Sequence, residues 1–266
     1  MKKIHSKTIL FITGAFVSHC GWDQWRLYFE ANGYTTIAPP WPFKNGTAAQ
    51  LRARRPNDTD LAALTLTQLI DHYAAYAKSC PEKPIIIGHS LGGLVTQILI
   101  NRDLGAAGVA IHPVAPKEVF PYEISFLRGV IGSLGLFTSL KKTYMMSFKK
   151  WQYAFTNGME LAEQRTAYEN NTIPESKTVA RGGLTSAASV DFKKPHAPLL
   201  ITAGSEDTII PAHLNYRNFK RYKQNGSVTE YKEFEGRNHY VLGLPTWKDD
   251  ADYILAWLDG RGDNSI

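Results

Sequence analysis

The sequence predicts an α/β fold with a mostly parallel central sheet flanked by helices. Short apolar runs, typical of strands buried on both faces, alternate with segments of helical spacing through the first 112 residues. The alternation stops there and resumes near residue 198, which indicates an inserted helical segment. A length of 266 residues suits one domain of this kind that carries an insertion.

The first half of the chain contains four predicted strands, which are residues 8–13, 34–38, 84–88 and 108–112. Apolar residues at helical spacing predict helices over 23–31, 61–78 and 91–102. The segment 41–59 is polar and punctuated by Pro and Gly, so it is interpreted as a loop. Strands and helices that alternate at this spacing predict right-handed crossovers and a parallel sheet.

Between residues 113 and 188 no comparable strand-like run occurs, and helical spacing predicts helices over 126–140 and 149–170. We expect residues 113–188 to form a helical cap. Alternation then resumes with predicted strands at 198–203 and 228–234 and predicted helices at 212–222 and 246–258. Residues 1–112 and 189–266 together would form the core of the domain.

The composition argues against several classes of protein. No apolar run reaches the ~18–20 residues of a membrane helix, and no signal-peptide core with a cleavage site is present. We therefore expect a cytoplasmic protein without a membrane span. The net charge of +6 comes from dispersed Lys and Arg without a basic-aromatic motif, which argues against nucleic-acid binding. The two cysteines, Cys20 and Cys80, are far apart and are expected to be free thiols.

A Gly-x-Ser-x-Gly motif carries the strongest chemical signal. The run Gly88-His89-Ser90-Leu91-Gly92 lies between the predicted strand 84–88 and the helix that begins at Leu91. This strand–turn–helix setting is that of a nucleophile elbow, in which a strained turn presents the serine and its neighbours must be small. A phosphate-binding turn is the alternative, but no Lys or Thr stands where a P-loop needs it. Ser90 is therefore the candidate nucleophile.

Two later residues complete the pattern of a serine hydrolase. A serine hydroxyl needs a base to remove its proton, and that base is usually a histidine oriented by a carboxylate. Asp207 follows the predicted strand 198–203, and His239 follows the predicted strand 228–234. Both positions are carboxyl ends of strands, where parallel sheets place their chemistry. The order Ser90, Asp207, His239 is the order of elbow-type hydrolases.

Other residues near these positions are weaker candidates. Glu206, the preceding residue of the acid loop, is an alternative acid. His196 and His213 follow no strand end and are interpreted as surface or loop residues. His89 lies inside the elbow and is interpreted as structural. His112 ends a strand and is interpreted as a residue that lines the site rather than as a base.

Three motifs, GHSLGG at the elbow, GSEDTIIP around the acid and GRNH at the base, carry a resemblance to the α/β-hydrolase family from residue 8 to about residue 258. The resemblance implies the α/β-hydrolase fold with a helical cap. It also implies Ser90 as nucleophile, His239 as general base and then acid, and Asp207 as the orienting carboxylate. The family spacing from Gly204 favours Asp207 over the adjacent glutamate.

The resemblance further implies an oxyanion hole of two backbone N–H groups. One donor would be Leu91, directly after the nucleophile. The other would be Ala15, in the loop after the first strand. Many family members have His-Gly where this chain has Thr13-Gly14. Since the donor is a backbone amide, this departure does not remove it.

The predicted cap is rich in apolar side chains, which indicates a mostly apolar pocket for a small-molecule substrate. The leading hypothesis is a serine esterase that works through an acyl-enzyme. Lactone, amide or C–C bond hydrolysis and perhydrolysis use the same side chains and stay open, as does a non-catalytic ligand receptor on the same fold. Candidate lining residues are Phe126, Leu134, Phe137, Tyr144, Met145, Met146, Trp151 and Phe155, with Trp22, Trp25 and Trp41 near the oxyanion loop.

No metal and no organic cofactor is implied by the sequence. Clustered Cys and His residues at ligand spacing are missing, and no Gly-x-Gly-x-x-Gly follows a strand. The oligomeric state is not readable from the sequence.

Overall fold

The computed structural model describes residues 3–135, 138–222 and 226–260. A sheet of six parallel strands lies at its centre, in the order β2-β1-β3-β4-β5-β6. The strands are β1 (Thr8–Ile12), β2 (Thr35–Ile37), β3 (Ile85–His89), β4 (Ala107–Ile111), β5 (Leu199–Gly204) and β6 (Thr229–Phe234). The predicted α/β class is therefore confirmed.

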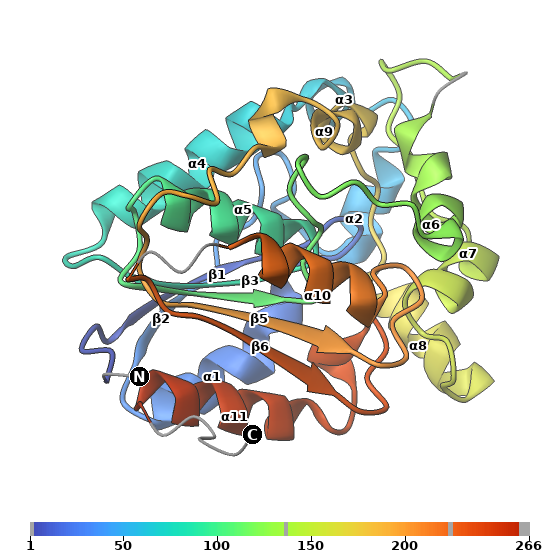
Figure 1. Ribbon diagram of the computed structural model, residues 1–266. Helices are drawn as coiled ribbons and strands as arrows, with labels where there is room; N and C mark the ends of the chain where they lie inside the picture. Colours follow the sequence, from blue (N-terminus) through green and yellow to red (C-terminus); the bar gives the residue numbers. More distant parts are fainter. Residues whose placement is uncertain (1–2, 136–137, 223–225, 261–266) are drawn as a thin grey trace.

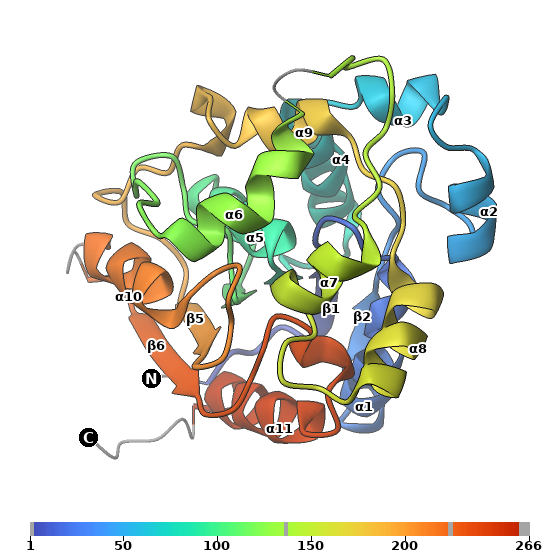
Figure 2. The same ribbon diagram turned by 90° about the vertical axis from the view of Figure 1, so that its right-hand side faces the viewer.

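Helices cover both faces of the sheet (Figure 1). On one face lie α4 (Leu66–Ser79), α5 (Leu91–Asn101) and α10 (Ala212–Arg221), and on the other lie α1 (Asp23–Ala31) and α11 (Trp247–Leu258). Short 3-10 helices are His19–Trp22, Ser186–Ala188 and Val241–Gly243. The other helices lie toward the carboxyl ends of the strands (Figure 2): α2 (Ala48–Ala53), α3 (Thr59–Ala63), α6 (Ile124–Leu134), α7 (Phe148–Ala154), α8 (Leu161–Asn171) and α9 (Lys177–Gly182).

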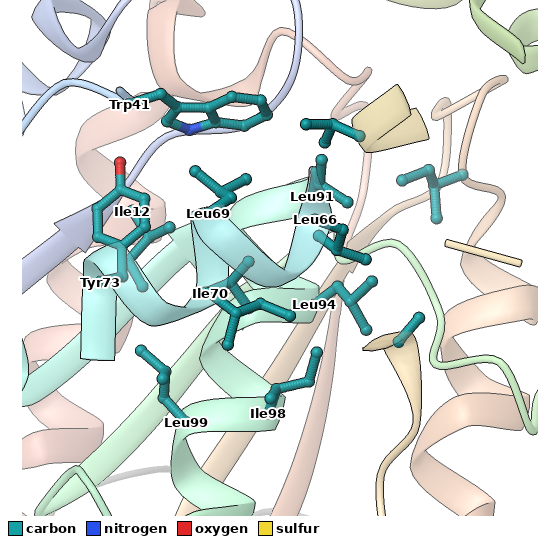
Figure 3. Packing of buried hydrophobic residues seen from close by; sticks show 14 of the residues in the cluster. Ile12, Trp41, Leu66, Leu69, Ile70, Tyr73, Leu91, Leu94, Ile98 and Leu99 are labelled. Atoms are coloured by element: carbon teal, nitrogen blue, oxygen red, sulfur yellow. The ribbon is translucent and has the colours of Figure 1, made fainter. Parts of the chain in front are cut away.

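Strand β1 shows how the sheet is buried on both sides. All five of its residues are buried, and successive side chains of a strand point to opposite faces. Ile9 and Phe11 pack with Trp25 of α1, whereas Leu10 and Ile12 pack in the cluster under α4 and α5. Figure 3 shows Ile12 in that second cluster with Trp41, Leu66, Leu69, Ile70, Tyr73, Leu91, Leu94, Ile98 and Leu99.

Two helix boundaries in the first half differ from the prediction. The expected helix 61–78 is divided into α3 and α4, because Thr65 and Gln68 form a capping box that starts α4. The expected loop 41–59 contains α2, which begins at a second capping box formed by Thr47 and Gln50. The loop prediction was wrong there because a capping box outweighed the polar composition of the segment.

Residues 113–188, called the helical segment below, contain α6 to α9 and no strand among the residues that the structure describes. The predicted helix 126–140 already ends at Leu134, where Gly135 adopts the left-handed conformation. The predicted helix 149–170 is two helices, α7 and α8, separated by a turn in which Gly158 has a φ of +79°. The short helix α9 was not predicted. Phe137 lies outside the described residues.

None of the described helices has the length and the apolar character needed to cross a membrane. Cys20 is exposed, Cys80 is partly buried, and both are free thiols, as expected.

Candidate active site

Ser90 occupies a strained turn between β3 and α5. Its φ of 59° and ψ of −120° are unfavourable for a residue with a Cβ. The glycines on either side are required by close packing. A Cβ on Gly88 would lie 2.1 Å from the carbonyl oxygen of Gly92, and a Cβ on Gly92 would lie 2.1 Å from that of Ile12. The motif thus forms the strand–turn–helix geometry of a nucleophile elbow.

Ser90 and the two predicted partners form one hydrogen-bonded series. Ser90 Oγ lies 3.0 Å from His239 Nε2, and His239 Nδ1 lies 2.6 Å from Asp207 Oδ2. With its proton on Nδ1, His239 donates to the carboxylate and can accept from the serine hydroxyl. Asp207 follows β5, His239 follows β6, and all three side chains are buried. The structure therefore brings together the three side chains that the sequence singled out.

The Asp207 carboxylate receives hydrogen bonds on both oxygens. The amides of Ile209 and Ile210 donate to Oδ1 at 3.1 and 2.7 Å, and the Nδ1 atoms of His239 and His112 lie 2.6 and 3.0 Å from Oδ2. Burial alone would raise the pKa of Asp207, but the attraction and hydrogen bonds of His239 and His112 bring it well below its usual range. The carboxylate is therefore anionic and fixed in orientation.

The role of His112 was missed by sequence reasoning. It was expected to line the site, but it is fully buried and does not line the cavity beside His239. Its backbone at the end of β4 donates to Thr202 of the neighbouring strand β5, which brings its imidazole to Asp207. A Cβ on Gly204 would lie 2.6 Å from His112 Cε1, so a glycine is needed beside the ring. The only signal for this contact was that the strands before His112 and Asp207, β4 and β5, end side by side in the sheet.

His89 is buried within the elbow, and its ring centre lies 4.7 Å from that of His239. Burial lowers its pKa well below the usual value, so the ring is neutral. Ligand atoms of His112, Asp207 and His239 lie within 4.8 Å of one another, a spacing that a metal ion could use. Both imidazole Nδ1 atoms are already within hydrogen-bond distance of one carboxylate oxygen. Hydrogen bonding accounts for the cluster, and we assign it no metal.

The remaining alternatives lie away from Ser90. Glu206 is exposed, next to the buried Asp207. His213 is exposed and lies 3.2 Å from the carboxylate of Glu123. The Nδ1 atom of His196 lies 2.7 Å from the carbonyl oxygen of the following residue.

The loop after β1 approaches Ser90 closely. A Cβ on Gly14 would lie 2.8 Å from the Cβ of Ser90. Among the described residues, the amides of Ala15 and Leu91 have no protein acceptor, and Leu91 stands in the first turn of α5, where no intrahelical acceptor is available. The amide of Phe16, in contrast, donates to Glu175. The amides of Ala15 and Leu91 are thus both available to bind an oxygen atom of a ligand near Ser90.

A cavity of about 260 Å³ opens beside His239. Phe155 of the helical segment forms one wall, with its ring edge-on to His239 at 4.9 Å. Trp151 stacks on the outer face of Phe155 at 4.3 Å. Ser90 does not line the cavity, whose described lining residues are Val17, Ser18, Cys20, Gly21, Gln24, His89, Phe155, Asn171, His239, Tyr240, Leu242 and Gly243.

The predicted aromatic contribution of Trp22 and Trp25 to the site was wrong. Both are fully buried in the other core cluster, where Trp22 stacks on Phe11 at 4.6 Å. Trp25 lies on α1 and Trp22 at its N-terminus, so both pack against the face of the sheet that α1 covers. Trp41 does reach the loop after β1, since its indole N–H donates to the carbonyl of Thr13 at 2.9 Å.

Similarity to known proteins extends over nearly the whole chain. Three similar structures are a monoacylglycerol lipase from Paleococcus ferrophilus (17% identity, TM-score 0.67, 98% of both chains), a methylesterase from Arabidopsis (13%, 0.65, 94% of this chain and 98% of that one) and methylketone synthase I from tomato (14%, 0.65, 96% and 99%). At such identities they show a shared fold alone. None of the curated protein sequences matches the chain. The alpha/beta hydrolase family, however, matches residues 9–253. The chain therefore belongs to the alpha/beta hydrolase family.

Proposed function

We propose that the protein is a serine hydrolase that cleaves the carboxylic ester of a small, mostly apolar substrate. The hydrogen-bonded series of Ser90, His239 and Asp207 at the elbow carries this proposal. The names of two similar structures, a monoacylglycerol lipase and a methylesterase, agree with an ester substrate. Other reactions are also found on this fold, so the site and not the fold supports the choice.

Each side chain has a defined task in the proposed mechanism. His239 Nε2 takes the proton of Ser90 Oγ as that oxygen attacks the acyl carbon, and anionic Asp207 stabilises the resulting imidazolium. The amides of Ala15 and Leu91 donate to the negatively charged oxygen of the tetrahedral intermediate. His239 then protonates the leaving alcohol, and an ester of Ser90 remains. Water activated by His239 hydrolyses that ester and restores Ser90.

The cavity beside His239 is the proposed place for part of the substrate. Its volume of about 260 Å³ lies below the ~300–1,000 Å³ of common ligand pockets, which favours small groups. Val17, Phe155 and Leu242 give it apolar walls, and Gln24 and Asn171 add polar groups. We also propose that the helical segment acts as a cap, because its Phe155 forms one wall of the cavity.

Hydrolysis of p-nitrophenyl esters tests the proposal. We expect the wild-type protein to hydrolyse the acetate and butyrate faster than the laurate, because the cavity is small. Ser90→Ala should reduce kcat by at least about 10³-fold and abolish labelling by a fluorophosphonate probe. Ser79→Ala, an exposed serine at the end of α4, is the matched control and should retain full activity. Wild-type hydrolysis by Ser90→Ala would refute the assignment.

A further inference from the structure

Glu175 is a buried carboxylate of the helical segment, with 1% of its surface exposed. Its Oε2 accepts hydrogen bonds from the backbone amide of Phe16 at 3.0 Å and from Lys44 Nζ at 2.6 Å. Its Oε1 accepts from the amide of Ser176 at 2.9 Å. Lys44 is equally buried, at 2% exposure. One carboxylate thus joins three separate stretches of chain in the interior.

Phe16, which binds Glu175, immediately follows the proposed oxyanion donor Ala15. Its φ of 69° is unfavourable for a side chain with a Cβ, so outside contacts must hold the residue. Besides the bond to Glu175, the Phe16 carbonyl accepts from the amide of Ile173 at 2.9 Å. The next residue, Val17, forms a β-bridge with Thr172. Residues 172–175 therefore hold both peptide groups of Phe16.

The other end of the same loop is held by the segment that carries Lys44. The indole of Trp41 donates to the Thr13 carbonyl at 2.9 Å. Lys44 Nζ lies 3.7 Å from the centre of the Trp41 ring, and the Lys44 amide donates to the Trp41 carbonyl at 3.0 Å. Lys44 and Trp41 therefore connect the contacts that fix Thr13 with those that fix Phe16. The peptide group between Gly14 and Ala15 lies between these two fixed positions.

We propose that Glu175 is a positioning residue that holds the Ala15 N–H in place to donate to the oxyanion. This inference rests on the proposed function. The Phe16 N–H is turned to the Glu175 carboxylate, so it does not compete with Ala15 as donor. Because Glu175 belongs to the helical segment, the oxyanion hole is complete only while residues 172–176 are seated on the loop.

The pairing with Lys44 keeps the Glu175 carboxylate in this place. A carboxylate only accepts hydrogen bonds, whereas a protonated acid would also present a donor to the Phe16 amide. Lys44 Nζ lies 2.6 Å from Glu175 Oε2, and both side chains are buried, so neither can exchange its partner for water. Removal of one partner alone leaves an uncompensated buried charge, so a variant that lacks both charges is the informative comparison.

Three variants separate a positioning role from a purely structural one. Glu175→Ala should lower kcat for p-nitrophenyl acetate about 10- to 100-fold, with KM within about threefold, because a transition-state contact is weakened. The double variant Lys44→Met with Glu175→Gln removes both buried charges and keeps an amide oxygen for the Phe16 N–H, with the NH2 group on the side of the Ser176 amide. It should retain kcat within about threefold of wild type. Glu123→Gln is the matched control, a buried glutamate of the same segment that pairs with Arg217.

Amide hydrogen exchange of residues 13–17 provides a readout that does not depend on activity. Exchange should be faster in Glu175→Ala than in wild type and unchanged in Glu123→Gln. The proposal is overturned by any of three results: full kcat in folded Glu175→Ala, a double variant as impaired as the single one, or unchanged exchange of the loop. Inactive wild-type protein that resists the fluorophosphonate would instead refute the proposed function, and the exchange result would still decide whether Glu175 holds the loop.

Discussion

The loop after β5 contains the buried Asp207, and the first turn of α11 contains the buried Asp250. The pKa values of these two carboxylates are shifted in opposite directions. Asp207 receives hydrogen bonds on both oxygens, and its pKa lies well below the usual range. Asp250 accepts from Arg237 Nε at 3.0 Å through Oδ1, while its buried Oδ2 has no partner among the described residues. Burial raises the pKa of Asp250 to about 6, despite the nearby Arg237.

The comparison shows that burial does not decide whether a carboxylate stays ionised, because both side chains have less than 5% of their surface exposed. The partners decide it, because the attraction and hydrogen bonds of His239 and His112 outweigh burial at Asp207, whereas those of Arg237 do not outweigh it at Asp250. Only Asp207 lies in a turn whose amides point at the carboxylate, and only Asp207 has two imidazoles beside it. The carboxylate with the lowered pKa is thus held by a loop and two strand ends, and the one with the raised pKa lies on a helix.

Asp207→Asn has the largest expected effect. An uncharged side chain no longer stabilises the imidazolium of His239 and favours the wrong tautomer, so kcat for p-nitrophenyl acetate should fall about 10³- to 10⁴-fold. Asp250→Asn is the matched control and should keep kcat within about twofold, since Asp250 does not contact the three site residues. More than a tenth of wild-type kcat in Asp207→Asn would contradict the role assigned to the acid.

His112→Phe removes one of the donors to Asp207 while it keeps a ring of similar size. Loss of a hydrogen bond to a charged group corresponds to about a tenfold decrease in kcat. Kinetics with p-nitrophenyl acetate measures this decrease. A variant with unchanged kcat would show that His112 only fills space.

The same variant should also change the stability of the protein in acid. The folded pKa of Asp207 lies below the unfolded value of about 3.9. Its contribution to the free energy of unfolding is therefore complete above about pH 5 and is lost as the pH falls through the folded pKa. With fewer donors, the folded pKa of Asp207 lies closer to the unfolded value, so His112→Phe should lose less stability than wild type as the pH falls below about 3. Urea unfolding at several pH values measures the two slopes, and equal slopes would contradict the prediction.

Asp250→Asn should act in the opposite direction on stability. The folded pKa of about 6 lies above the unfolded value of about 3.9, so the folded protein binds more protons between these values. The free energy of unfolding then falls as the pH rises from 4 to 6. The asparagine removes this loss, and we expect a gain of about 1–2 kcal/mol at pH 7 and none at pH 4. Urea unfolding measures the free energy at both pH values. Equal gains at pH 4 and pH 7 would contradict the prediction.

Lys248→Gln has the smallest expected effect. Lys248 pairs with Asp252 one turn away on α11, at 2.8 Å, and about half of each side chain is exposed. Such pairs contribute less than about 0.5 kcal/mol and are screened by salt. Thermal unfolding with and without about 0.5 M NaCl measures the contribution. A decrease of more than about 1 kcal/mol in the free energy of unfolding would show that the exposure of a carboxylate does not predict how much its ion pair contributes.

The sheet and the three central site residues were predictable because each has a local signal. The strands are short apolar runs, and the elbow needs glycines at fixed spacing around Ser90. His112 and Glu175 have no such signal. His112 meets Asp207 across 95 positions of sequence, and Glu175 meets Phe16 across 159. Their partners follow from how strands and loops pack, which a reading of local pattern does not contain.

Some helix ends had a local signal in the sequence, and others had none. The capping boxes at Thr47 and Thr65 are visible in the sequence, and attention to them would have placed α2 and the start of α4 correctly. The break between α7 and α8 is different, because Gly158 alone is compatible with a helix interior. Tertiary contacts decide there: Asn238 binds the carbonyl of Asn157, and the Tyr240 amide binds that of Phe155.

Two isolated β-bridges, Val17 with Thr172 and Tyr144 with Glu175, attach residues 172–175 of the helical segment to neighbouring chain. We call these two bridges the seam, and substitutions at it are expected to be tolerated less well than substitutions elsewhere in the segment. Helix α6 lies outside this seam, and its Ile124, Leu127 and Ile131 are 82, 47 and 58% exposed. Substitutions of these exposed residues of α6 should therefore leave both bridges intact. Substitutions over residues 172–176 would alter the attachment of the segment itself and mix loss of rate with change of specificity.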